Sequence, residues 1–129
     1  MSTLKADTIQ STGGGAATLT KQHAAKAWAH IGASGDTLPD SFNISSLDDD
    51  DTGQYGLNFT NNMGSALYSA NMNITFNHSS TVNNVRVAEI ESKNASSVEV
   101  DSGYVGVNGV YGEYDIEVDA SVTVHGDLL

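Results

Sequence analysis

The feature that most constrains this chain is the regular alternation of apolar and polar residues from Trp28 onward. Successive side chains of a β-strand point to opposite faces, so a period of two places one face in a core and the other in solvent. The alternation is clearest over residues 54–60, 71–77 and 114–124. Weaker runs of the same kind cover residues 40–47, 82–90, 97–100 and 104–111. The chain is therefore predicted to be built from short strands.

Short polar segments separate these runs and predict turns. Residues 48–53 and 61–64 are two such breaks, and Asn108-Gly109 is a strong signal for a two-residue hairpin. About eight short strands at this spacing predict an all-β domain, either an antiparallel β-sandwich or a jelly-roll-like domain. Residues 114–124 are predicted to form one strand, whose solvent face would carry Asp115, Glu117 and Asp119.

The beginning of the chain differs from the remainder in charge and in flexibility. The first 30 residues hold three lysines and one carboxylate, whereas residues 31–129 hold fifteen of the sixteen carboxylates. The run Gly13–Gly15 has high backbone entropy and predicts a hinge. We therefore expect an extended attachment arm over residues 1–22 and a β-sandwich head over residues 23–129. The arm would be anchored through Leu4, Lys5 and Ile9.

Charge and composition argue against several classes of function. The net charge of −11 would repel phosphates, so nucleic-acid binding is not expected. The chain has no cysteine, which excludes disulfides and thiolate metal sites. The start of the sequence has no apolar core of a secretory signal, and no stretch approaches the length of a membrane span. We expect no membrane insertion.

The acidic run Asp48–Asp51 is the one candidate for a metal site. Carboxylates in a loop can bind Ca²⁺, and Asp48 and Asp50 match the first positions of an EF-hand loop. The twelfth position of that loop requires a bidentate Glu, but Phe59 occupies it here. An EF-hand is therefore excluded. Asp48 and Asp50 remain weak candidates for calcium ligands, and a solvated acidic hairpin is the favoured interpretation.

No residue pattern in the sequence points to catalysis. The four histidines lack the spacing of a zinc site, and no Gly-x-Ser-x-Gly motif is present. Glu99 and Asp101 share one strand face, as the acid and base of a glycosidase can. The solvent face of a strand is the simpler interpretation of such a pair. We expect no enzymatic activity and no cofactor.

The aromatic residues fall into two groups. The first group is expected in the core or in a subunit interface and comprises Trp28, Phe42, Tyr55 and Phe59. Tyr104 and Tyr111 lie near glycines at predicted loop ends, where an aromatic ring can stack on a sugar. These two tyrosines are candidates for receptor contact, with core or interface packing as the alternative.

Several segments, taken in order, resemble one known family. They are residues 3–11, Ala25-Lys-Ala-Trp28, Gly35-Asp36, Asp40-Ser-Phe-Asn-Ile-Ser-Ser46, Thr52-Gly-Gln-Tyr-Gly-Leu-Asn-Phe-Thr60 and Val122-Thr-Val-His-Gly-Asp127. The chain resembles tail-fibre-like and other virion structural proteins of marine and cyanobacterial tailed bacteriophages. It departs from the family pattern at Ala29 and Pro39, and residues 77–112 match only in general β character.

The resemblance implies a structural protein on the exterior of a virion. It implies a homotrimer that attaches to other virion proteins through its arm. A tail-fibre-like appendage that contacts a host receptor, such as a surface glycan, is the favoured role. Decoration of the outer capsid lattice is the first alternative role, and that of a carbohydrate-binding module is the second.

Overall fold

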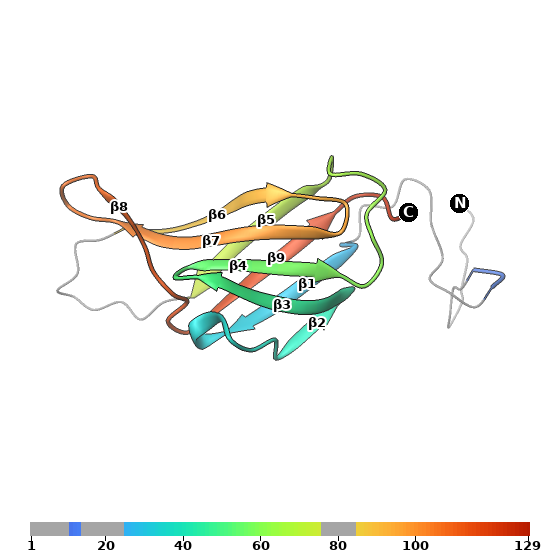
Figure 1. Cartoon of the computed structure of the whole chain (residues 1–129), viewed down its shortest axis with the longest axis horizontal. Coiled ribbons are helices and arrows are strands. Elements are labelled where there is room, and N and C mark those ends of the chain that lie inside the picture. Colours follow the sequence, from blue (N-terminus) through green and yellow to red (C-terminus); the bar gives the residue numbers. More distant parts are fainter. Residues whose placement is uncertain (1–10, 14–24, 76–84) are drawn as a thin grey trace, which may run out of the picture.

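The computed structural model describes residues 11–13, 25–75 and 85–129. In this part of the chain, nine strands form two antiparallel sheets that pack against each other (Figure 1). The predicted all-β sandwich is thus confirmed. The predicted anchoring residues Leu4, Lys5 and Ile9 lie outside the described residues, as does most of the predicted arm.

The first sheet joins segments that are far apart in sequence. Its strands are β1 (Ala27–Gly32), β2 (Asp40–Phe42), β5 (Ser69–Thr75) and β9 (Asp119–His125). They lie in the order β2-β1-β9-β5, so the last strand of the chain pairs with both β1 and β5. A short 3₁₀ turn, Ala33–Gly35, follows β1.

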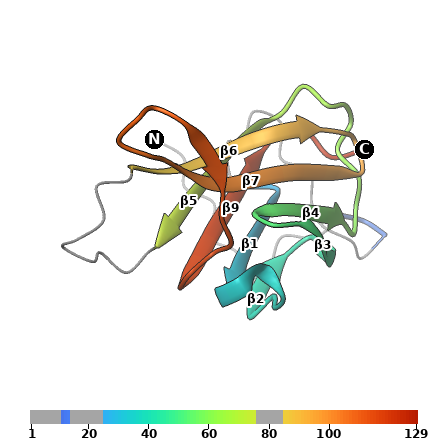
Figure 2. The ribbon, with the colours of Figure 1, turned by 60° about the vertical axis from the view of Figure 1, so that its left-hand side comes forward.

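The second sheet has five strands. They are β3 (Ile44–Asp51), β4 (Gln54–Phe59), β6 (Val85–Lys93), β7 (Ser97–Val105) and β8 (Tyr111–Glu113). The order is β3-β4-β7-β6, and β8 pairs with the end of β7. The hairpins β3–β4 and β6–β7 each stay within this sheet, and Figure 2 shows its strands crossing those of the first sheet.

The core follows the alternation seen in the sequence. In β1 the residues Ala27, Ala29 and Ile31 are buried, whereas the side chains between them are only half-buried. The same pattern in the other strands contributes the remaining core residues, Tyr55, Leu57, Phe59, Met63, Tyr68, Val98, Val100, Ile116, Ala120, Val122 and Val124. Tyr55 and Phe59 are therefore in the core. This is one of the two placements, core or subunit interface, that were predicted for them.

Gly35 occupies a position that only a glycine fits. It adopts a φ of +70°, which a side chain strains, and a Cβ atom there would lie 1.7 Å from Tyr55 Cε1. The turn after β1 therefore packs its backbone directly on the Tyr55 ring. Any larger residue at position 35 would have to push this buried ring out of the core.

The acidic run Asp48–Asp51 is not a loop, contrary to the sequence-based expectation. β3 continues through Asp51, and Asp48 and Asp49 pair with Gly56 and Tyr55 of β4. The hairpin turn is confined to Thr52-Gly53, where Gly53 takes a φ of +75°. Pairing with β4 outweighs the poor strand propensity of Asp because it satisfies the backbone of the run.

The predicted single strand over residues 114–124 is also wrong. β9 begins only at Asp119, and residues 114–118 cross from one sheet to the other. The crossing is held in place because Ile116 O accepts a hydrogen bond from Ser34 N–H at 2.7 Å. Asp115 and Glu117 therefore do not lie on the solvent face of a strand.

Candidate functional surfaces

The outer face of the first sheet combines aromatic rings with amides and hydroxyls. Trp28 and Phe42 are direct cross-strand neighbours in β1 and β2, and Thr123 of β9 lies opposite Trp28 on its other side. Asn71 and Asn73 of β5 extend the same row of side chains, opposite Thr123 and Ser121. We call the surface formed by Trp28, His30, Phe42, Asn71, Asn73, Ser121 and Thr123 the aromatic–amide face.

Solvent reaches this face. Phe42 is 49 % exposed, Asn71 and Asn73 are exposed, and Trp28 is half-buried. Trp28 and Phe42 thus belong to an outer surface rather than the core, and the other placement predicted for them, a subunit interface, stays a prediction. Planar aromatic surface next to amide donors and acceptors is the chemistry that recognises sugar rings.

The outer face of the second sheet is acidic. The residues that form it, which we call the acidic face, are Asp48, Asp50, Glu89, Glu91, Glu99, Asp101 and Glu113. Among the described residues, two of the three lysine and arginine side chains contact groups outside this face. Lys26 precedes β1 of the other sheet, Arg86 pairs with Glu117, and Lys93 donates to Tyr68 O at 2.9 Å.

One half of the acidic face gathers over Gly56. A Cβ atom at this position would lie 2.9 Å from Glu99 Oε2 and 3.2 Å from Asp50 Oδ2, so both carboxylates occupy the space that a side chain would fill. Asp48 lies alongside and accepts a hydrogen bond from Asn58 Nδ2 at 2.7 Å. Burial, together with the charges of neighbouring carboxylates, raises the pKa of Glu99.

The other half of the acidic face surrounds Asp101. This side chain is only 8 % exposed, and its Oδ1 atom is buried without a hydrogen-bond partner. Glu89 lies directly opposite on β6, and Gln54 lies opposite on β4. Burial raises the pKa of Asp101 to about 6, and the charges of Glu91, Glu89 and Glu113 act in the same direction.

The two candidate receptor-contact tyrosines lie on opposite faces of the β7–β8 ribbon. Tyr111 stands opposite Val105, so its hydroxyl lies above Gly103, whereas Tyr104 stands opposite Gly112. Tyr104 meets the Tyr114 ring edge-on, with 6.1 Å between ring centroids. The pair therefore does not form one stacking platform, and Tyr111, which is 41 % exposed, remains the candidate for contact.

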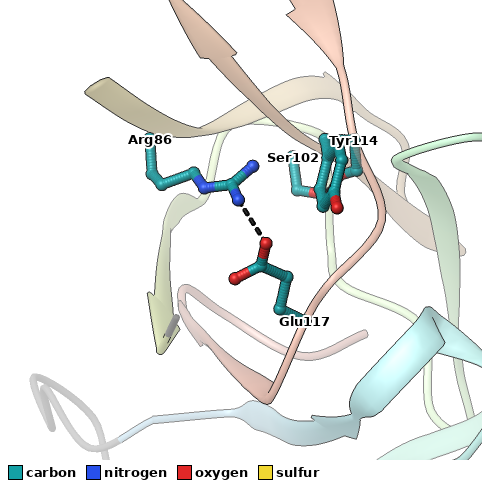
Figure 3. A network of polar contacts seen from close by, with 4 residues as sticks. All are labelled: Arg86, Ser102, Tyr114 and Glu117. Atoms are coloured by element: carbon teal, nitrogen blue, oxygen red, sulfur yellow. Dashed lines mark hydrogen bonds and ion pairs between the residues drawn. The ribbon is translucent and has the colours of Figure 1, made fainter. Parts of the chain in front are cut away.

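A polar network holds the segment that contains Tyr114 and Glu117 (Figure 3). Arg86 forms an ion pair with Glu117, and its guanidinium carbon lies 4.4 Å from the centroid of the Tyr114 ring. Ser102 Oγ donates to Tyr114 O at 2.5 Å. These contacts tie β6 and β7 to the crossing segment, so Glu117 has a structural partner that its place in the sequence did not reveal.

Asp48 and Asp50, the weak calcium candidates, lie on β3 rather than in a loop, and both are exposed. Within the described residues, no group of three or more His, Asp or Glu side chains is arranged to hold a metal ion. Residues 11–13, 25–75 and 85–129 also contain no helix long and apolar enough for a membrane crossing.

Comparison with protein-family models, with curated proteins and with solved structures found no match for this chain. The two packed antiparallel sheets define the chain as an all-β sandwich protein.

Proposed function

We propose that this chain is a structural protein on the exterior of a tailed-bacteriophage virion, with a tail-fibre-like role in host contact. The family resemblance supports this role, and the structure shows what some of the matching residues do. Gly35 and Tyr55 pack on each other, and Asn43 ties the corner between β2 and β3 to neighbouring segments. These contacts give three of the matching residues a role in folding, which supports a structural protein.

The observation that carries the proposal is the aromatic–amide face. It lies on a rigid sheet, and its Phe42 ring is half-exposed beside Trp28. Asn71 and Asn73 flank the rings with amides that can both donate and accept hydrogen bonds. A host surface glycan is the ligand class that this combination suits, because sugars offer apolar ring faces and many hydroxyls.

The test is adsorption of the purified protein to host cells and to surface polysaccharide extracted from them. Phe42→Ser should reduce binding about tenfold, as expected for loss of a stacking ring at a central contact. Leu67→Ser is the matched control, because Leu67 is 93 % exposed but lies outside the aromatic–amide face. Equal binding by wild type and Phe42→Ser would exclude this face as the contact.

Tyr111→Ser in the same assay tests the second candidate contact. Loss of adsorption in this variant alone would place host contact on the β7–β8 ribbon. Quantitative mass spectrometry of particles separates the tail role from capsid decoration, because a tail appendage requires tens of copies or fewer and a capsid lattice hundreds. Hundreds of copies per particle would replace the tail-fibre-like role with decoration of the capsid.

A further inference from the structure

We propose that the acidic face is a docking site for a basic, extended polypeptide segment of another protein, with Asp101 at its centre. This inference concerns the opposite side of the sandwich from the aromatic–amide face. It does not depend on the proposed role in host contact.

The acidic face concentrates negative charge on one side of the sandwich. Seven carboxylates project from four strands, β3, β6, β7 and β8, and two of them, Glu89 and Asp101, are direct cross-strand neighbours. Like charges in that relation destabilise a sheet. Solubility alone does not require such crowding, since exposed loops could carry the same charges with less destabilisation of the fold. A cationic partner would turn the repulsion into attraction.

One carboxylate oxygen of Asp101 has no hydrogen-bond partner. Its Oδ1 atom is buried and accepts no hydrogen bond, although buried carboxylate oxygens normally do. Glu89 and Glu113, which flank Asp101 on the same face of the sheet, are exposed. A guanidinium or ammonium group would supply the missing donor together with the opposite charge. The unpartnered oxygen of Asp101 therefore indicates a ligand that carries both a hydrogen-bond donor and a positive charge.

The carboxylates of the acidic face are regularly spaced along their strands. Within single strands they occur two residues apart, as Asp48 and Asp50, Glu89 and Glu91, and Glu99 and Asp101. Alternate residues of an extended segment are spaced by about 7 Å, so basic residues at every second position would match this spacing. The carboxylates are spread over the whole sheet rather than gathered at one point. This distribution fits a polypeptide, which can present several separate cations.

The experiment measures binding of a fluorescently labelled peptide of five Arg-Ser repeats by fluorescence polarisation at pH 7.5. Asp101→Asn removes the central charge but keeps the size of the side chain, and it should weaken binding about tenfold. The exposed double variant Glu89→Gln/Glu91→Gln, which leaves the core intact, should weaken binding to a similar extent. Raising the salt concentration should weaken binding further, because exposed charges are screened.

The control is the double variant Asp40→Asn/Asp127→Asn, which removes two exposed carboxylates away from the acidic face. It should bind the peptide nearly as tightly as wild type. If it loses as much affinity as Glu89→Gln/Glu91→Gln, the peptide recognises only net charge and the proposal is wrong.

A calcium titration without peptide, at constant ionic strength, tests the other class of cation. Suppose that millimolar Ca²⁺ raised the melting temperature by many degrees and that Glu89→Gln/Glu91→Gln abolished the rise. The acidic face would then be a metal site, and docking of a basic segment would be overturned. An unchanged melting temperature, together with localised peptide binding, supports the proposal.

Discussion

At the scale of single residues, Asn43 holds more of the fold together than its place between two strands suggests. It adopts a φ of 58°, in the left-handed region that Asn tolerates better than most residues. Its Nδ2 donates to Lys26 O at 3.1 Å and to Asn61 O at 3.0 Å, and its Oδ1 accepts from Asn61 N–H at 2.7 Å. One side chain thus joins the beginning of β1, the corner between β2 and β3, and the segment after β4.

We expect Asn43→Ala to lower the free energy of unfolding by about 2–3 kcal/mol, through lost hydrogen bonds and strain in the left-handed backbone. Asn43→Gly keeps the backbone conformation available and should cost less than Asn43→Ala. Urea denaturation of the two variants separates the contributions of backbone and side chain. Equal stability of Asn43→Ala and wild type would show that the side-chain contacts contribute nothing.

Asp101 makes stability depend on pH. Because its pKa is about 6 in the folded chain and lower in the unfolded chain, the folded state binds more protons between those two values. The contribution of Asp101 to stability therefore falls as pH rises from about 4 to about 6 and stays low above that range. Asp101→Asn should stabilise the protein by on the order of 1–3 kcal/mol at pH 8 and have little effect at pH 4.

The measurement is denaturation of wild type and Asp101→Asn at both pH values, with Asp127→Asn as an exposed control. If Asp101→Asn is more stable than wild type but binds the basic peptide more weakly, then Asp101 lowers stability in favour of binding. Destabilisation by Asp101→Asn at pH 8 would mean that the charged form is well accommodated, against the argument from its unpartnered oxygen.

At the scale of elements, the crossing segment 114–118 connects the sheets through Asp115. Asp115 Oδ1 accepts hydrogen bonds from Gly53 N–H at 2.9 Å and from the Tyr55 hydroxyl at 3.3 Å. The same hydroxyl accepts from Ile116 N–H at 3.2 Å. The hairpin turn between β3 and β4 is thus bound to the strand connection that leads into β9.

We expect Asp115→Ala and Tyr55→Phe each to cost about 1–2 kcal/mol of unfolding free energy. Because the two side chains share a hydrogen bond, the double variant should cost less than the sum by at least about 0.5 kcal/mol. Thermal and urea denaturation of wild type, the two single variants and the double variant complete this double-mutant cycle. Strict additivity would show that the crossing segment is held by its other contacts instead.

The elements differ in how far the sequence predicts them. Alternation identifies the buried face of β4 and of β9, because burial on one face imposes a period of two on any half-buried strand. It does not reveal where a strand stops. The acidic run looks like a loop but is held in β3 by pairing, and residues 114–118 alternate like a strand but leave the sheet. In both places a tertiary contact overrides the local pattern.

At the scale of the whole molecule, the two outer faces could not be read from the sequence. Glu99 and Asp101 are recognisable as neighbours on one strand face, but Glu89 and Asp48 join them only through strand pairing. Likewise Trp28, Asn71 and Thr123 become one row because β9 lies between β1 and β5. The sandwich thus separates an acidic side from an aromatic and amide side, and each side can serve a different partner.

The expected assembly into a homotrimer belongs to the same scale. The β7–β8 hairpin projects beyond the body of the sandwich (Figure 1). It exposes Val107, Val110 and Tyr111, at 79 %, 59 % and 41 %, and Val85 of β6 is 68 % exposed. Apolar side chains gathered at one end of a small domain are typical of an interaction site, because exposing them to water is unfavourable.

For the homotrimer that the resemblance implies, light scattering at micromolar concentration should give three times the chain mass of 13.5 kDa. Val107→Asp/Val110→Asp should give the monomer mass with an unchanged circular dichroism spectrum, since both residues lie in the hairpin loop outside the core. Leu67→Asp is the control, because it adds a charge at an equally exposed apolar residue away from the hairpin. A monomeric wild type would contradict the trimer, and a trimeric double variant would move the interface away from the hairpin.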